Sequence, residues 1–285
     1  MKLIPKKSLG QNFLKDDAVL QRIVKNAELS ADDIVIEIGP GQGALTELLA
    51  QKCKKVIAIE LDDRLIESLH NKFIDNENTE IIHGDILEIN LVDLISNFQF
   101  PISNQFSKSN DKILENKSNV EYKVVANLPY YITSPIIRLF LETQFPPKEM
   151  IIMVQKEVAE RITAKAGNMS ILAVSVQYYA KPEYLFTVSR EAFDPIPKVD
   201  SAVIRIARDK RQETRNKQEA KDFFRIVRAG FSAKRKTLIN NLSNGLQIDK
   251  KEIEEKLNTL GFTKNTRAQE LSVENWKSLA RLFYL

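Results

Sequence analysis

Hydrophobic positions along the first two thirds of the chain follow two alternating patterns. Short apolar runs occupy residues 34–38, 56–60, 80–85, 122–126 and 150–154, as is typical of buried strands. Apolar residues at helical spacing occupy residues 18–27, 44–52, 63–73, 136–142 and 156–164. Strands that alternate with helices in this way predict a parallel, doubly wound α/β sheet.

The pattern changes further along the chain. Residues 170–179, 184–189 and 201–206 are further candidate strands, and we expect a seven-stranded sheet. Beyond residue 209 the chain becomes charged, with helical periodicity at residues 220–229, 234–242, 250–260 and 273–283. We therefore predict an α/β domain over residues 1–209 and a small all-α domain over residues 210–285.

Two segments of the first domain depart from this order. The first fifteen residues form a basic leader with four lysines and no acid. Residues 98–119 consist largely of Asn, Ser, Lys and Gln, and we expect a long polar excursion between a helix and a strand there.

Overall composition excludes several classes of protein. Hydrophobic residues make up 43% of the 285 residues and charged residues 28%, so we expect a globular chain rather than a disordered or fibrous one. No apolar run approaches the ~20 residues that span a bilayer, and residues 1–7 lack the apolar stretch of a secretory signal. The single cysteine, Cys53, fits a reducing compartment, and two histidines are too few for a zinc site of nitrogen and sulfur ligands. We expect a cytoplasmic, metal-free protein that does not bind membranes.

Positive charge is concentrated near the expected domain boundary. The net charge is only +4, but residues 205–236 contain twelve Lys/Arg and four Asp/Glu, a local balance of +8. Such segregation suits a polyanionic partner such as RNA, and Lys234, Arg235 and Lys236 are the candidate contacts. The alternative is a solvated helix face.

A glycine-rich turn follows the first strand of the sheet and would let the backbone approach a ligand. Gly39, Gly41 and Gly43 have the spacing G-x-G-x-G rather than the G-x-G-x-x-G of dinucleotide-binding folds, which argues against a nicotinamide cofactor. Glu37, at the end of this strand, would repel a pyrophosphate and tolerate a sulfonium cation. An ordinary tight turn is the alternative.

Acids end the next two strands. Glu60 lies about 20 residues after the glycines, where an acid commonly accepts both hydroxyls of a ribose. Asp85 is placed to accept from an adenine amino group. Both are expected at the carboxyl edge of the sheet, where open α/β folds bind ligands, although either alone could be a helix cap or a solvated strand end.

The most specific signal is Asn-Leu-Pro-Tyr at residues 127–130, after the fourth strand. It matches the [N/D/S]-x-P-[Y/F/W] pattern of enzymes that methylate exocyclic amines. The Asn127 side-chain oxygen and a backbone carbonyl near Leu128 would accept the two N–H bonds of an adenine N6 and turn its lone pair toward a methyl donor. Tyr130 would stack on the extruded base, and Phe193 could cover its other face; core or loop packing is the alternative for Phe193.

With these motifs, the chain resembles the ribosomal RNA adenine N6-dimethyltransferase family, above all its bacterial small-subunit members. The similarity covers nearly the whole chain and is carried by residues 7–14, 37–46, 60–62, 84–85, 127–130, 155–161, 193–201 and 267–271. It implies a Rossmann-like, seven-stranded S-adenosylmethionine-dependent methyltransferase fold with a small all-α C-terminal domain.

The resemblance also implies a cofactor and a substrate. S-adenosylmethionine, without a metal, would contact six residues: Asn12 and Leu14 of the leader, Gly39, Glu60, Asp85 and Asn127. The implied reaction places two methyl groups on N6 of each of two adjacent adenines in the 3′-terminal hairpin of 16S rRNA. The implied substrate is a nearly assembled 30S subunit, late in its biogenesis, and the enzyme is expected to be a monomer.

Two departures from the family pattern stand out: residues 98–119 are longer than expected, and Asn168-Met169 replaces a Tyr-Gly-like pair. Three other functions stay open. A large-subunit rRNA methylase of the antibiotic-resistance (Erm) type shares the glycine loop and the Asn127 motif, but residues 267–271 disfavour it. A ribosome assembly factor whose methylation is secondary and a nicotinamide oxidoreductase are the others.

Overall fold

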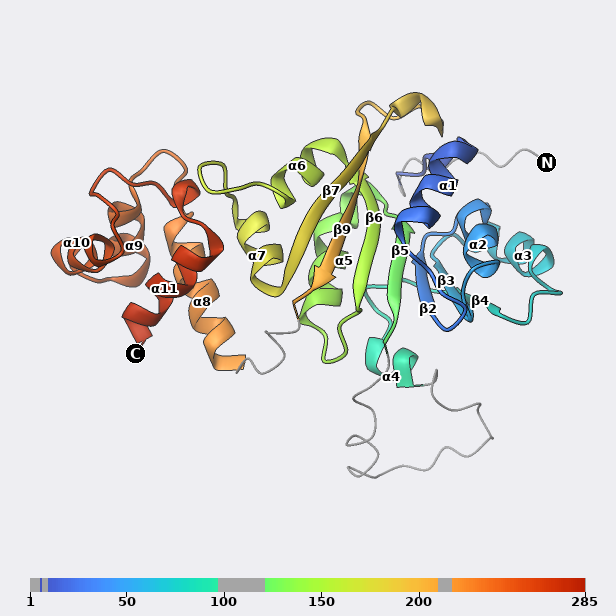
Figure 1. Cartoon of the computed structure of the whole chain (residues 1–285), viewed down its shortest axis with the longest axis horizontal. Coiled ribbons are helices and arrows are strands. Elements are labelled where there is room, and N and C mark those ends of the chain that lie inside the picture. Colours follow the sequence, from blue (N-terminus) through green and yellow to red (C-terminus); the bar gives the residue numbers. More distant parts are fainter. Residues whose placement is uncertain (1–5, 7–9, 97–120, 210–216, 285) are drawn as a thin grey trace, which may run out of the picture. The chain divides into compact units, whose positions relative to one another are not determined.

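The computed structural model describes residues 6, 10–96, 121–209 and 217–284 (Figure 1). The chain forms two compact units, of which the first contains residues 1–156 and 183–208 and the second contains residues 157–182 and 209–285. One division therefore falls at the residue where the composition changes. Residues 157–182 group with the C-terminal helices, which a single boundary near residue 209 does not include. The expected excursion at residues 98–119 lies outside the described residues.

The first unit is built on a seven-stranded sheet. Its strands in chain order are β2 (Ile34–Ile38), β3 (Lys55–Glu60), β4 (Thr79–His83), β5 (Lys123–Asn127), β6 (Glu149–Gln155), β7 (Ala180–Val188) and β9 (Ser201–Arg208), of which β7 begins within the second unit. A separate two-stranded sheet pairs β1 (Phe13–Leu14) with β8 (Phe193–Asp194). The helices are α1 (Asp17–Asn26), α2 (Ala44–Ala50), α3 (Asp63–Lys72), α4 (Leu91–Ser96) and α5 (Thr133–Glu142).

The order of the strands is β4-β3-β2-β5-β6-β9-β7, which can be followed across Figure 1. The pairs from β4 to β6 are parallel, whereas β9 is antiparallel to β6. The predicted Rossmann-like, seven-stranded fold is confirmed. Its register places the carboxyl ends of β2, β3 and β5 at one edge, because Ile38 pairs with Ile59 and Ile36 with Val124.

Successive side chains of the strands point to opposite faces of the sheet, and both sets are buried. Val35, Val56 and Val125 lie in one buried cluster. The same cluster contains Leu20 and Ile23 of α1 and Leu45 and Leu49 of α2. The intervening strand residues, such as Ile36 and Ile57, are also fully buried. A strand buried on both faces reads as a continuous apolar run, which is the pattern in the sequence.

One expected strand is a helix. Residues 170–179 form α7 (Ile171–Tyr179), and the Ser170 hydroxyl caps it by accepting the N–H of Ala173 at 3.2 Å. The prediction of a strand was wrong because the apolar run is buried on more than one side: Ala173, Val174 and Tyr178 all lie in the core of the second unit. A short, continuous apolar run does not distinguish a buried helix from a buried strand by periodicity.

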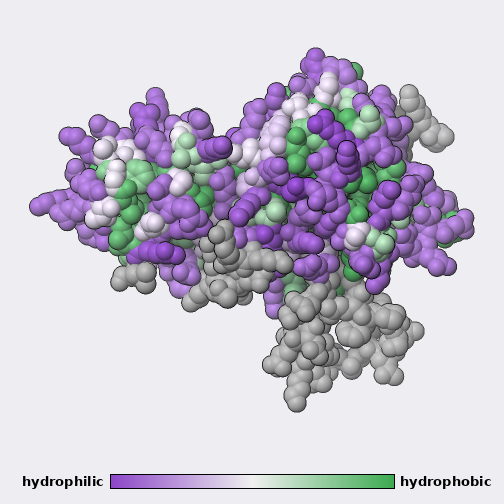
Figure 2. Space-filling model, viewed as in Figure 1, coloured by the Kyte–Doolittle hydropathy of each residue, from purple (hydrophilic) through white to green (hydrophobic). Residues whose placement is uncertain are grey.

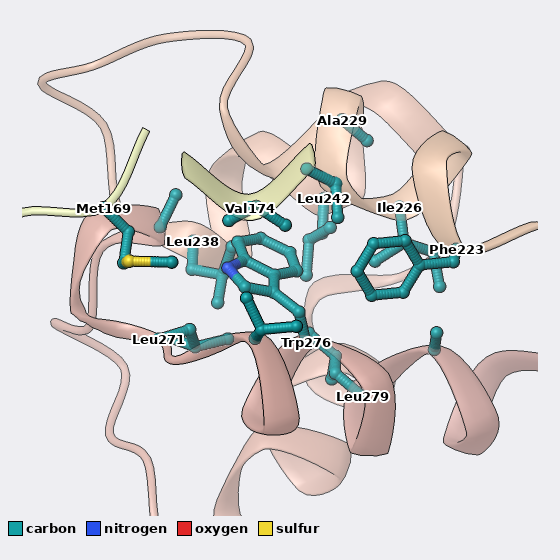
Figure 3. Close-up of a cluster of buried hydrophobic side chains, with 14 of the residues drawn as sticks. Met169, Val174, Phe223, Ile226, Ala229, Leu238, Leu242, Leu271, Trp276 and Leu279 are labelled. Atoms are coloured by element: carbon teal, nitrogen blue, oxygen red, sulfur yellow. The ribbon is translucent and has the colours of Figure 1, made fainter. Parts of the chain in front are cut away.

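The second unit is helical. Besides α7 it contains α8 (Lys217–Gly230), α9 (Leu238–Leu246), α10 (Lys250–Thr259), α11 (Val273–Tyr284) and most of α6 (Lys156–Ile162). Trp276 is fully buried at the centre of its core, among side chains that include Val174, Leu238 and Leu271 (Figure 3). Polar residues cover most of the face of the molecule seen in Figure 2, with hydrophobic residues in smaller areas. Among the described residues, no helix has the length and hydropathy to cross a bilayer.

Candidate active site

A cavity in the first unit opens at the carboxyl edge of the sheet. The chain runs from β2 outward through β3 and β4, then returns to β5 on the other side of β2, so the strand order reverses between β2 and β5. Open α/β sheets bind ligands at such a switch point. Residues 10–14 of the leader and the segments after β2, β3, β4 and β5 line the cavity. The described residues that line it include no lysine, arginine or histidine.

The glycine loop after β2 brings backbone to the floor of this cavity. Gly39 and Gly41 have φ angles of +67° and +59°, which side chains rarely tolerate. A Cβ atom at Gly41 would lie 3.1 Å from the Phe13 ring of the leader, so the loop and the leader approach closely there. The Gly41 N–H donates to Glu60 Oε2 at 3.0 Å. The loop is therefore held in place by the acid that ends the next strand.

Glu60 is the most buried of the predicted cofactor contacts, with 5% of its surface exposed. Its Oε1 accepts the Asp62 N–H at 2.8 Å while Oε2 accepts from Gly41. Burial raises the pKa of Glu60, and the backbone hydrogen bonds from Asp62 and Gly41 oppose that rise. Both oxygens have lone pairs left at the cavity wall, as acceptance from two ribose hydroxyls requires.

Asp85 and Glu37 complete a set of three carboxyl groups along the cavity. Asp85 follows β4, and its Oδ1 accepts the Leu87 N–H at 2.9 Å. Glu37 lies in β2 and is only 1% exposed, and its Oε2 has no hydrogen-bond partner among the described residues. Burial raises the pKa of Glu37 to about 8. A buried carboxyl group with one oxygen that no described residue engages, beside a ligand cavity, favours a cationic ligand.

Asn127 ends β5 beside Met153 of β6 and is one of the residues that line the cavity. No described residue forms a hydrogen bond with its side-chain amide. The backbone around it is fixed, since the Leu128 N–H donates to the Met153 carbonyl at 3.1 Å and the Ile132 N–H donates to the Pro129 carbonyl at 3.2 Å. A free amide on a rigid backbone is suited to accept from, or donate to, a bound ligand.

Tyr130 lines the same cavity, and a residue of β9 holds its hydroxyl group. Its hydroxyl lies 2.6 Å from Ser201 Oγ, at the start of β9, and Ser201 is fully buried. Burial raises the pKa of the Tyr130 hydroxyl, which therefore stays protonated. The hydrogen bond holds the hydroxyl end of the ring in place, which keeps the ring at the cavity where a base could stack on it.

Phe193 lies elsewhere. Its side chain is 1% exposed and belongs to the core cluster with Leu20 and Val35, and it is not among the residues that line the cavity. Its backbone in β8 pairs with Leu14 of the leader. The reason for the burial is this pairing, which turns the ring away from the cavity into the core. Covering a base would require the ring to leave this core, so that role stays a prediction.

The leader residues Asn12 and Leu14 do line the cavity. The Asn12 side chain donates to the Gly10 carbonyl at 3.0 Å. The preceding residue, Gln11, donates from Nε2 to Asp62 Oδ2 at 2.8 Å. Hydrogen bonds from Arg64 and then from Gln11 lower the pKa of Asp62, so this buried acid is ionised and holds the leader beside β3.

The basic triad lies in the second unit, and its local structure differs from the prediction. A helix was expected over residues 234–242, but α9 begins at Leu238, and Lys234, Arg235 and Lys236 occupy the turn before it. The turn is set by Asn241 of α9, whose side-chain amide donates to the Gly230 and Ala233 carbonyls at 2.6 and 3.0 Å. All three cations are exposed.

Sequence reasoning did not single out Asp62, Ser201 or Asn241, although each holds a candidate residue in place. Asp62 had a usable signal, because an Asp before a helical segment is a preferred N-cap, and its side chain does cap α3. Ser201 contacts Tyr130, which is 71 positions away in the sequence, and Asn241 contacts Gly230, which is 11 positions away. No local pattern in the sequence reveals such contacts.

The polar groups that line the cavity fit S-adenosylmethionine. That cofactor carries a sulfonium and an ammonium group, two ribose hydroxyls and an adenine amino group. The cavity has three carboxyl groups, which can accept from the cofactor's hydroxyl and amino groups and attract its cations, and a free amide at Asn127. The described residues that line it include no basic one, so a pyrophosphate would meet negative charge there. Within the described ranges, no group of three or more His, Cys, Asp or Glu side chains is arranged to hold a metal ion.

Comparisons with known proteins show to which family the chain is related. The family model for ribosomal RNA adenine dimethylase matches residues 4–284. A protein named ribosomal RNA small subunit methyltransferase A, from Dehalococcoides mccartyi strain CBDB1, is 43% identical over 274 residues, which are 96% of this chain and 87% of the relative.

Solved structures show the same similarity. A dimethyladenosine transferase from Plasmodium falciparum superimposes with a TM-score of 0.74 at 27% identity, over 94% of this chain and 95% of that one. The 23S rRNA methyltransferase ErmE superimposes with a TM-score of 0.73 at 26% identity, over 96% of this chain and all of that one. Because the family model covers nearly the full length and a curated relative exceeds two-fifths identity, the chain belongs to the ribosomal RNA adenine dimethylase family, as the resemblance of its motifs predicted.

Proposed function

We propose that this chain dimethylates N6 of two adjacent adenines in the 3′-terminal hairpin of small-subunit rRNA, with S-adenosylmethionine as the methyl donor. Membership of the family and the name of its Dehalococcoides relative support an rRNA substrate in the small subunit. The single observation that carries the chemistry is the unengaged Asn127 amide at the cavity wall that also contains Glu60 and Asp85.

The proposed roles follow from the contacts of each residue. Glu60 accepts from the ribose hydroxyls, Asp85 accepts from the adenine amine, and Gly39, Asn12 and Leu14 enclose the cofactor. When bound there, S-adenosylmethionine supplies an electrophilic methyl group on a positively charged sulfur. Glu37 offers that charge a nearby carboxyl group, which ionises more readily beside a cation.

On the substrate side, the residues of the Asn127 segment present the amine. The lone pair of an adenine N6 is delocalised into the ring and is a poor nucleophile. Asn127 Oδ1 and a backbone carbonyl near Leu128 accept its two N–H bonds, which favours a pyramidal nitrogen with the lone pair directed into the cavity. Tyr130, held by Ser201, stacks on the extruded base, an interaction worth roughly 1–3 kcal/mol. Positioning and exclusion of water are the main contributions of the protein.

The partner is proposed to be a nearly assembled 30S subunit in the cytoplasm, bound by a monomer. The basic turn at Lys234, Arg235 and Lys236 supports contact with RNA phosphates, because its three cations are exposed and make no ion pair with any described residue. Its proposed role is to bind the subunit while the cavity of the first unit receives one adenine at a time.

The test is mass mapping of methylated nucleotides. Purified protein and S-adenosylmethionine are incubated with 30S subunits and with 50S subunits from cells that lack the modification. We expect dimethyladenine at two adjacent positions of the 3′-terminal hairpin of 16S rRNA and none in 23S rRNA. Methylated adenine confined to 23S rRNA would instead support the function of ErmE, and the absence of methylation in both subunits would refute the proposal.

A further inference from the structure

Helix α8 carries a second set of cations on its solvent side. Lys221, Arg225 and Arg228 are spaced four and three residues apart, so they lie on one face of the helix, and all three are exposed. The opposite face is apolar, with Ile226 and Val227 fully buried in the core of the second unit.

The residues that the structure describes do not compensate the charges on this face. None of the three side chains forms an ion pair or a hydrogen bond with a described residue. Elsewhere in the same unit, two partly buried lysines are paired: Lys256 lies 3.7 Å from Glu252, and Lys277 lies 2.6 Å from Glu274. The acid nearest in sequence, Asp222, accepts instead from Gln218 at 3.1 Å. Three unpaired cations on one face raise the local potential.

The same helix leads directly into the basic turn, and both are held rigidly. Asn241 fixes the turn through the carbonyls of Gly230 and Ala233, and the Leu238 N–H donates to the Thr266 carbonyl at 2.7 Å. Helices α8 and α9 pack closely, because a Cβ atom at Gly245 would lie only 2.6 Å from Ala229 Cβ. The α8 face and the turn therefore belong to one preformed framework.

We propose that Lys221, Arg225 and Arg228 form an RNA-binding face that extends the basic turn, with Asn241 as a residue that positions the turn. This inference rests on the proposed function and names the phosphate backbone of rRNA as the ligand. From residue 221 to residue 228 the helix rises roughly 10 Å, so the three cations reach more than one phosphate. Two of the three are arginines, whose planar donors bind phosphate oxygens in pairs.

The experiment compares two variants that lose the same charge from the same unit. In the face variant, Lys221→Gln, Arg225→Gln and Arg228→Gln are combined. In the control, Lys250→Gln, Lys251→Gln and Arg281→Gln are combined; these residues are also exposed but lie on α10 and α11. Affinity for 30S subunits that lack the modification is measured across a range of salt concentrations, with thermal unfolding and S-adenosylmethionine binding as checks on folding.

We expect the face variant to flatten the slope of log affinity against log salt by about 2, since each lost phosphate contact removes roughly 0.7–0.9 from the slope. The control should keep the slope of the wild type. Equal slopes for the two variants would overturn the proposal, whether both fall or neither does. A loss of affinity with an unchanged slope would also overturn it, because the face would then contact a ribosomal protein.

The outcome is separable from that of the proposed function. If the wild type produces dimethyladenine in 16S rRNA and the face variant binds like the control, only the inference about α8 fails. If the wild type produces no dimethyladenine in any subunit, the proposed function fails whatever the slopes show.

Discussion

Asn127 combines a fixed backbone with a side chain that no described residue engages. Most of the other polar groups around the cavity are already partnered: Glu60 accepts two backbone N–H groups, Asp85 accepts one, and Tyr130 is bound to Ser201. An amide left free in such surroundings is the residue most available to the substrate.

Replacement of this amide tests its role directly. Asn127→Ala should slow single-turnover methylation of 30S subunits by about 100-fold or more, because small losses of positioning are costly in catalysis. The dissociation constant for S-adenosylmethionine, measured by calorimetry, should change little. That binding serves as the control for folding, and a variant that methylates at the rate of the wild type would remove Asn127 from the mechanism.

Glu37 leads to a prediction about pH. Burial raises the pKa of this carboxyl group from 4.5 to about 8 in the folded protein. The folded state therefore keeps a proton that the unfolded chain loses above its ordinary pKa. The contribution of Glu37 to the free energy of unfolding is fully present below pH 4.5 and falls as the pH rises toward 8.

The comparison that isolates this group is Glu37→Gln, which keeps the shape of the side chain and cannot ionise. Between pH 5 and 8 we expect the wild type to lose stability more steeply than the variant, by up to ~1.4 kcal/mol per pH unit. Urea unfolding at a series of pH values measures both curves. If the two curves run parallel across this range, the carboxyl group does not titrate as described.

At the scale of elements, the sequence predicts those site residues that stand at the end of a strand, because the ends of parallel strands meet at one edge of the sheet. Gly39, Glu60 and Asn127 each follow or end an apolar run, and parallel strands bring such positions together. The helix at residues 171–179 was not predictable from periodicity, because its apolar residues face the core on several sides. The burial of Phe193 depends on the pairing of β8 with the leader, a contact between distant segments.

Close packing between α8 and α9 yields a prediction on stability. A methyl group added at Gly245 would meet Ala229 Cβ at 2.6 Å, so Gly245→Ala must push the helices apart. We expect the free energy of unfolding to fall by about 1–3 kcal/mol, as for other overpacked contacts. Thermal or urea unfolding of the full chain measures the loss.

The matched control exchanges the two methyl groups. Combining Ala229→Gly with Gly245→Ala removes the opposing atom, and much of the lost stability should return. A double variant that is less stable than both single variants would show that the contact between the helices is not the cause.

At the scale of the molecule, the acidic groups of the cavity lie in the first unit and the basic groups proposed to bind RNA lie in the second. The cavity of the first unit is lined by three carboxyl groups and by no basic residue among those described, which suits a cationic cofactor. The second unit carries cations on α8 and in the turn before α9 that form no ion pair with a described residue, which suits a polyanion. An overall charge of +4 conceals this separation.

The most direct measurement is a crystal structure of the full chain with S-adenosylmethionine. We expect the ribose hydroxyls on Glu60, the adenine amine on Asp85 and the sulfur-bound methyl group facing Asn127. Density for the cofactor at another place, or in this cavity with the methyl group turned away from Asn127, would contradict the account.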